Sequence, residues 1–178
     1  MTQRKAFLTK EQSLMLRGIA IFLVLISHYA VWIGEIFHSD LLEYGLGRFG
    51  VYGVDLFFAV SGYGLVKSVG KKRINGTFLW KRFKTVYLPY LLIVGLIAVY
   101  DGGISGMTGW VSFLTGAEYW YIRNILIFYL AFYVVYRLSD RSWVRMLLMA
   151  LCLTAYSGLL IWQGRALFWY ISNVTFLF

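Results

Sequence analysis

Long runs of apolar residues, separated by short polar segments, dominate the chain. A helix needs about 20 mostly apolar residues to cross the ~30 Å hydrocarbon core of a bilayer. Five runs approach that length: residues 14–34, 50–69, 85–100, 120–138 and 143–162. A last run, 166–178, is too short to cross by itself. The pattern therefore predicts an all-α polytopic transmembrane helix bundle with five full spans and a partial sixth.

The composition supports lipid as the solvent of this chain. Hydrophobic residues make up 60% and charged residues 14%, against roughly 45–50% and about 25% in soluble domains. No cleavage site follows the first run, so we expect a retained helix rather than a signal peptide. The length leaves no room for a separate soluble domain, and we predict one transmembrane domain over residues 1–178. Cys152 is the single cysteine, so neither an intrachain disulfide nor a metal site is predicted.

Lysine and arginine are distributed unevenly between alternate segments. Fourteen of the 17 lie in the N-terminal segment up to Arg17, in residues 67–84 and in residues 137–145. Basic loops stay on the cytoplasmic side of a membrane. We therefore predict a cytoplasmic N-terminus and a cytoplasmic loop at 67–84, in a multi-pass protein of the plasma or inner membrane. The net charge of +9 reflects this topology, and no nucleic-acid partner is predicted.

Three polar side chains inside the predicted spans carry the chemical hypothesis, because ionisable groups are costly in hydrocarbon. Arg17 and His28 are eleven positions apart on the first helix, about three turns plus 20°, so they share one face. Counting from the membrane surface places Asp55 of the second helix at nearly the depth of His28. A carboxylate that orients an imidazole produces a general base. The alternative is that His28 makes an interhelical hydrogen bond that serves packing.

Ser61 is a weaker candidate on the second helix. As a nucleophile it would lie about 9 Å deeper than Asp55, away from the level of His28. A serine beside Gly62 and Gly64 more often allows two helices to approach closely.

Four stretches carry a resemblance to a known family. They are Arg17 with His28 after ten intervening residues, the string Gly-Val-Asp-Leu-Phe-Phe-Ala-Val-Ser-Gly at 53–62, the basic segment leading into Tyr-Leu-Pro-Tyr at 81–90, and the aromatic residues at 120–129. Their order and spacing resemble acyltransferase family 3, a group of membrane-bound enzymes. Thr85 stands where the family often has a second loop arginine. Members usually have about ten spans and twice this length, so the sequence is expected to be an N-terminal half.

The resemblance implies transfer of an acyl group, commonly acetyl, from acyl-CoA to a hydroxyl of a cell-surface carbohydrate. Acyl-CoA would be the donor substrate, with no permanently bound cofactor. The implied partners are membrane lipid, a polysaccharide or glycolipid acceptor, and either a second copy of the chain or further helices. The expected site residues are His28 and Asp55 for catalysis, Arg17, Lys81, Arg82 and Lys84 for the donor, and Ser61, Tyr29 and Trp120 in support.

Two other function classes compete with the enzyme. An inactive or partner-dependent membrane fragment would keep the same motifs, and a transporter would use intramembrane His, Asp and Arg side chains as a relay. Acyl-CoA consumption discriminates between them and the enzyme.

The outer segment 101–119 is glycine-rich, and we expect a flexible loop with Trp110, Tyr119 and Trp120 at the lipid interface.

Overall fold

The computed structural model describes residues 7–69, 74–165, 167 and 172–177. All regular structure in these residues is helical, with no strand. Five helical stretches among them are long and apolar enough to cross a membrane, which confirms the predicted all-α polytopic bundle. The chain forms two compact units, residues 1–68 with 171–178, and residues 69–170. The prediction of one domain, like the predicted orientation of the N-terminus, stays a prediction.

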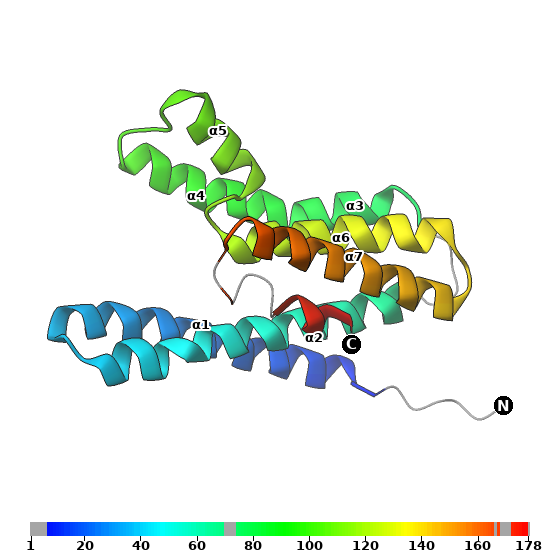
Figure 1. Cartoon of the computed structure of the whole chain (residues 1–178), viewed down its shortest axis with the longest axis horizontal. Helices are drawn as coiled ribbons and strands as arrows, with labels where there is room; N and C mark the ends of the chain where they lie inside the picture. The colour runs from blue at the N-terminus through cyan, green and yellow to red at the C-terminus, as the bar shows by residue number, and fades with distance from the viewer. Residues whose placement is uncertain (1–6, 70–73, 166, 168–171, 178) are drawn as a thin grey trace. The chain divides into compact units, whose positions relative to one another are not determined.

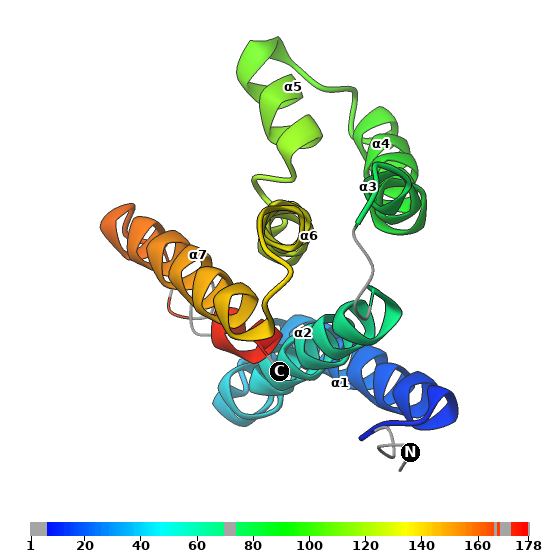
Figure 2. The ribbon, with the colours of Figure 1, turned by 90° about the vertical axis from the view of Figure 1, so that its right-hand side faces the viewer.

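The first unit is built on an antiparallel pair of helices, α1 (Lys10–Phe37) and α2 (Phe49–Val69) (Figures 1 and 2). A capping box starts α1, since Thr9 and Gln12 each satisfy a backbone N–H of the other. The connection contains a π-helix, η1 (Leu41–Gly45), and a 3-10 helix, η2 (Leu46–Arg48). Both spans begin several residues earlier than predicted, counting η1 and η2 with α2.

Small residues allow α1 and α2 to lie close together. A Cβ atom added at Gly53 would lie 2.7 Å from the carbonyl oxygen of Ala20, so a larger residue cannot fit there without a shift of backbone. The Ser27 hydroxyl donates a 2.5 Å hydrogen bond to the Gly47 carbonyl. Close backbone approach through small residues is the usual way in which helices associate in membranes.

The third span begins eight residues before the predicted start at Thr85. It comprises α3 (Thr77–Arg82), the π-helix η3 (Phe83–Tyr87) and α4 (Leu88–Tyr100), so that the described part of the expected basic loop, from Thr77 on, is helical. The helix extends because apolar side chains such as Phe78 face α6, where the Phe78 and Phe132 rings stack. The π-helix precedes Pro89, which has no N–H to bond to residue 85 and whose ring crowds that carbonyl.

Residues 106–115 form a helix where the sequence predicted a flexible loop. This helix, α5 (Gly106–Thr115), runs back beside α4 (Figure 1). Two tyrosine hydroxyls, one from η3 and one from α4, bind the last turn of α5. Tyr87 donates to the Leu114 carbonyl at 2.5 Å, and Tyr90 donates to the Phe113 carbonyl at 2.6 Å. The glycines of this segment suggested a loop, but the structure uses Gly116, with φ of 64°, to end the helix.

The fourth and fifth spans, α6 (Trp120–Leu138) and α7 (Ser142–Trp162), agree closely with the prediction. Arg145 is buried at the turn between them. Its guanidinium group donates to the carbonyls of Ser139 and Tyr136, pairs with Asp140 at 3.3 Å and lies 4.3 Å from the Tyr136 ring centre. This arginine therefore has a structural role.

The expected partial sixth span is described only in part. Residues 172–177 form a 3-10 helix, η4 (Ser172–Leu177), which belongs to the first unit. Apart from residue 167, the rest of the run 166–178 lies outside the described residues. So do the basic residues 4, 5 and 71–73, which contributed to the predicted orientation.

Candidate functional site

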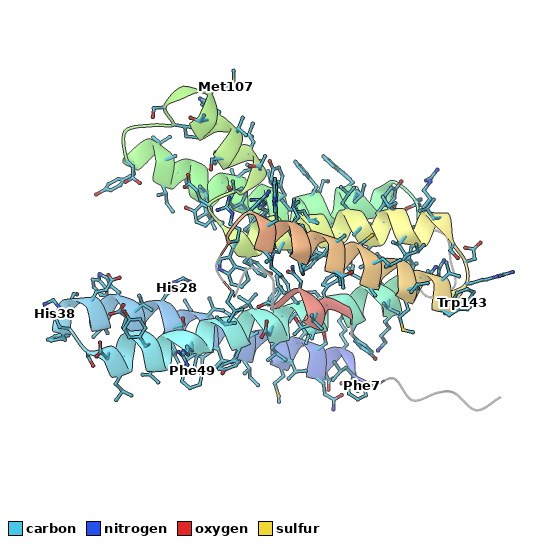
Figure 3. The ribbon with its side chains drawn as sticks, viewed as in Figure 1. Phe7, His28, His38, Phe49, Met107 and Trp143 are labelled. Atoms are coloured by element: carbon cyan, nitrogen blue, oxygen red, sulfur yellow. The ribbon has the colours of Figure 1, made fainter. Side chains whose placement is uncertain are left out.

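Arg17 and His28 lie on α1, as the sequence predicted. Arg17 is half-buried, and its guanidinium approaches α2 at Gly64, where an added Cβ would lie 3.4 Å from Nη2. The Nε atom of Arg17 is buried without a hydrogen-bond partner among the described residues. His28 projects from α1 with an exposed side chain (Figure 3), as does its neighbour Tyr29. The helix therefore presents a half-buried cation and an exposed imidazole.

The structure does not join His28 and Asp55 by a hydrogen bond or ion pair among the described residues. The reason is the rotation of α2 about its axis. Gly53 contacts α1 at Ala20 and Val24, and Asp55, two residues later, lies about 200° round the helix from it. Asp55 thus lies on the side of α2 that faces away from α1. The catalytic roles of the two residues stay predictions.

Asp55 instead faces the 3-10 helix η4. The face of α2 that carries Asp55 also carries Gly62, where an added Cβ would lie 2.5 Å from the Phe176 carbonyl oxygen of η4. Oδ1 of Asp55 and Oγ of Ser172 are both buried and have no hydrogen-bond partner in the described part of the chain. Ser61, the other polar candidate on α2, is also buried. The first unit therefore contains two buried polar side chains without hydrogen-bond partners among the described residues, Asp55 on α2 and Ser172 on η4.

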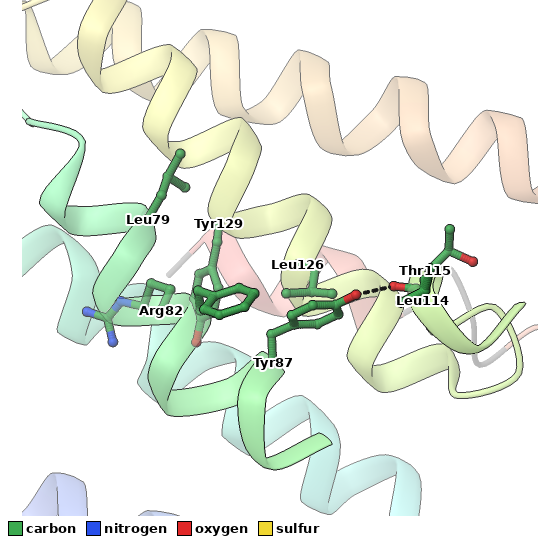
Figure 4. A pocket seen from close by; sticks show the side chains of 8 residues that line it. Leu79, Arg82, Tyr87, Leu114, Thr115, Leu126 and Tyr129 are labelled. Atoms are coloured by element: carbon green, nitrogen blue, oxygen red, sulfur yellow. Dashed lines mark hydrogen bonds between the residues drawn. The ribbon is translucent and has the colours of Figure 1, made fainter. Parts of the chain in front are cut away.

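The second unit contains a pocket of about 400 Å³, and Arg82 supplies its one charged side chain (Figure 4). The guanidinium carbon of Arg82 lies 5.4 Å from the Phe78 ring centre and 5.5 Å from the Tyr129 ring centre. Its Nε is buried and has no hydrogen-bond partner among the described residues. The full lining is Leu79, Arg82, Phe83, Tyr87, Leu114, Thr115, Leu126 and Tyr129.

The depth of Arg82 follows from its contact with α6. Tyr129 is the middle residue of α6, which has 19 residues and measures about 28 Å, close to the thickness of the hydrocarbon core. The guanidinium group against Tyr129 therefore lies beside the middle of α6, although Arg82 itself is only the sixth residue of the third span. Because lipid offers it no acceptor, an unpaired arginine at that depth is a candidate for binding an anion.

The other predicted donor residues lie on the same stretch of helix. Lys81 and Lys84 are exposed, and Lys84 lies 5.0 Å from the Trp80 ring centre. Trp120 is half-buried at the first position of α6. None of the three lines the Arg82 pocket.

Sequence reasoning missed two polar features. The Tyr156 hydroxyl donates a 2.8 Å hydrogen bond to Oδ1 of Asn124, which is fully buried between α6 and α7. An asparagine inside an apolar run was a visible signal for an interhelical bond. Ser172 was missed because its contact with Asp55 joins residues far apart in the sequence, and no local pattern indicates such a contact.

The fold and these polar groups define a multi-pass membrane protein with ionisable side chains inside its helices. A family model described as an acyltransferase domain matches residues 15–178. The chain therefore belongs to acyltransferase family 3, which confirms the resemblance found in the sequence.

One curated relative matches over a shorter region. "Protein 2 in picA locus" of Rhizobium radiobacter is 34% identical over 90 residues, which cover 48% of this chain and 42% of the relative. The match thus spans well under two thirds of the relative's length. No solved structure matches the chain significantly.

Proposed function

We propose that this chain takes part in moving an acyl group, with acetyl as the expected one, from acyl-CoA to a hydroxyl of a cell-surface carbohydrate. The observation that carries the proposal is the Arg82 pocket, in which the guanidinium Nε is buried without a hydrogen-bond partner among the described residues, in a chain of an acyltransferase family. Its volume of about 400 Å³ falls in the usual range for small-molecule sites.

The donor would be held by charge and by stacking. Arg82, between two aromatic rings, would bind a phosphate of CoA through the fork of its guanidinium group. Lys81 and Lys84, exposed on the same helix, add positive charge at the approach. Arg17, in the first unit, stays a proposed donor residue, since its Nε is also buried without a partner among the described residues.

The reaction needs a base for the acceptor hydroxyl, and His28 is the proposed one. Its imidazole would take the hydroxyl proton as the acceptor oxygen attacks the thioester carbon. The new C–O bond forms while the C–S bond breaks, and the imidazolium returns the proton to the departing CoA thiolate. Asp55 is proposed to assist as the orienting carboxylate, with Ser61, Tyr29 and Trp120 as supporting residues. Because Asp55 faces away from α1 in this structure, the pair would require α2 to rotate against α1.

The exposure of His28 suits this role. A base that must meet a carbohydrate cannot be closed off in a packed interface, and the His28 side chain is open among the described residues. The competing reading as a packing histidine gains nothing from the structure, since His28 makes no hydrogen bond across helices in the described part of the chain. A transporter that used these side chains as a proton relay would not consume acyl-CoA.

The test is release of free thiol from acetyl-CoA by the purified full chain, with and without an acetyl-free bacterial polysaccharide. We expect acceptor-dependent thiol release in the wild-type protein and its loss in His28→Ala. The matched control is His38→Asn, because His38 is the second histidine, is exposed, and sits at φ of 51°, which Asn tolerates.

Wild-type turnover by His28→Ala would remove His28 from the mechanism. Absence of any acyl-CoA consumption by the folded wild-type chain, also after helices encoded downstream are co-expressed, would favour the inactive fragment or the transporter.

A further inference from the structure

The pair formed by Asp55 and Ser172 is the feature that the proposed reaction leaves unexplained. Ser172 is 0% exposed, and its hydroxyl and the Oδ1 atom of Asp55 both lack a hydrogen-bond partner among the described residues. Polar atoms buried at membrane depth without a partner are costly, since lipid cannot satisfy them. Two such atoms on helices that contact each other, α2 and η4, mark a polar site rather than ordinary packing.

We propose that η4 docks along α2 as part of this site, and that Ser172 is a positioning residue for Asp55. The role of Ser172 in catalysis rests on the proposed acyl transfer, whereas the docking of η4 on α2 does not.

The spacing of contacts along the two helices supports the docking. Asp55 and Gly62 are seven residues apart, two turns less 20°, so they share a face of α2 and lie about 10 Å apart along its axis. Ser172 and Phe176 span about 8 Å of a 3-10 helix. The Phe176 carbonyl meets Gly62, where an added Cβ would lie 2.5 Å from the oxygen. Because the two spacings are similar, this contact places Ser172 near the level of Asp55.

Gly62 acts as a notch in the surface of α2, a position without a side chain that allows η4 to pack closely against the helix. The missing side chain lets the η4 backbone approach α2 at Phe176, which brings Ser172 level with the Asp55 carboxyl. Any side chain at position 62 would push η4 outward and separate the two polar groups.

The chemistry of the pair explains what Ser172 would do. A serine hydroxyl turns about its Cα–Cβ bond and donates one hydrogen. Donation to one oxygen of Asp55 would fix the rotamer of the carboxyl group and leave its second oxygen for the acceptor hydroxyl or for an imidazole. Ser172 would thus act through Asp55, without touching the substrate.

Disulfide cross-linking of the full chain tests the docking without any activity assay. In a Cys152→Ser background, Asp55→Cys with Ser172→Cys should form a disulfide under mild oxidation in membranes. The matched control is Asp55→Cys with Val174→Cys, because Val174 is 55% exposed and lies on the other side of η4. We expect a strong yield for the first pair and little for the second. Equal yields, or no cross-link with Ser172→Cys, would overturn the docking.

Gly62→Ala adds a second arm to the same experiment. It should lower the yield of the 55–172 disulfide several-fold, because the new Cβ would displace η4. Gly158→Ala is the control, since nothing lies within 4 Å of a Cβ at that helical position. An unchanged yield in Gly62→Ala would contradict the role of Gly62 as a notch.

A double-mutant cycle tests the positioning role. Ser172→Ala should lower kcat about tenfold with little change in KM for acyl-CoA, and should have no further effect in an Asp55→Asn background, because Ser172 acts through Asp55. Additive losses would assign Ser172 a merely structural role and overturn the positioning. If cross-linking succeeds while no variant or wild-type chain turns over, the docking stands and the proposed function fails.

Discussion

At the scale of single residues, two arginines with buried guanidinium atoms show how to separate structural from functional charges. Arg145 is satisfied by two carbonyls, a carboxylate and an aromatic ring. Arg82 has its rings but leaves Nε without a hydrogen-bond partner in the described residues, and it lines a pocket. A buried charge without a partner is costly, so Arg82 is expected to gain its partner from a ligand.

Arg82→Ala should therefore weaken binding of acyl-CoA rather than folding. A hydrogen bond to a charged group contributes about 1.5–3 kcal/mol, so we expect KM for acyl-CoA to rise roughly 10–100-fold. Arg82→Lys should restore little, because an ammonium group lacks the planar fork. Steady-state kinetics over a range of acyl-CoA concentrations measures this, with Arg141→Ala, an exposed arginine, as control. An unchanged KM would remove Arg82 from the donor site.

Arg145→Ala should show the opposite behaviour. Loss of its contacts frees two carbonyls and a carboxylate at the α6–α7 turn, so we expect a lower unfolding temperature in detergent, from a loss of about 3 kcal/mol or more. KM for acyl-CoA should stay within twofold of the wild type. A change in KM with unchanged thermal stability would contradict the structural role.

At the scale of helices, the contact between α1 and α2 depends on glycines of one helix meeting the backbone of the other. This contact also explains why Asp55 does not reach His28. The depth of Asp55 could be counted from the sequence, but its direction depends on which face of α2 packs against α1. Gly50 and Gly53 determine that face, because they allow α2 to pack closely against α1. Whether two helices form such a close contact or a polar pair depends on tertiary packing, which the sequence pattern does not show.

Gly53→Ala should lower the stability of the protein, whereas Gly18→Ala should leave it unchanged or raise it. Alanine at 53 would place Cβ 2.7 Å from the Ala20 oxygen, whereas nothing lies within 4 Å of a Cβ at 18. We expect Gly53→Ala to cost about 1–3 kcal/mol by overpacking and Gly18→Ala to be neutral or to stabilise by up to about 1 kcal/mol. Thermal or denaturant unfolding in the same detergent measures both. Equal stability of the two variants would show that the contact is not tight.

The helices also show how much of the fold could be predicted from the sequence. The helices α6 and α7 were placed within one residue, because their apolar runs end in charged and polar residues. The start of α3 was missed, since Lys81, Arg82 and Lys84 suggested a loop although Phe78 and Leu79 pack on α6. The helix α5 was missed because the five glycines of segment 101–119 outweighed its apolar face. The donor residues were chosen by residue type and stay a prediction, whereas the pocket around Arg82 depends on α5 and could not be predicted.

At the scale of the whole molecule, the predicted orientation in the membrane rests on the distribution of charge in the sequence. The described residues include nine of the 14 basic residues on the predicted cytoplasmic segments, and neither the helices nor the family match determines which side they face. The orientation therefore needs its own experiment.

Cysteine labelling should place Asn75 and Asp101 on opposite sides. Both are exposed and lie at the two ends of the third span. In a Cys152→Ser background, a membrane-impermeant maleimide should label Asp101→Cys in intact cells and label Asn75→Cys only after the membrane is opened. The reverse pattern would invert the predicted topology, and with it the side from which acyl-CoA must approach Arg82.

The glycine contacts between α1 and α2 also bear on how the protein enters the membrane during synthesis. Alone in lipid, Arg17 on α1 would cost about 2.5–3.5 kcal/mol at the centre of the bilayer, whereas in the hairpin its guanidinium group lies against α2 at Gly64. The contacts that join these helices come from their own residues and their short connection. A nascent chain can therefore fold α1 and α2 into a hairpin beside the translocon and release both into lipid together. The helices of the second unit, which the ribosome makes later, are not needed for that step.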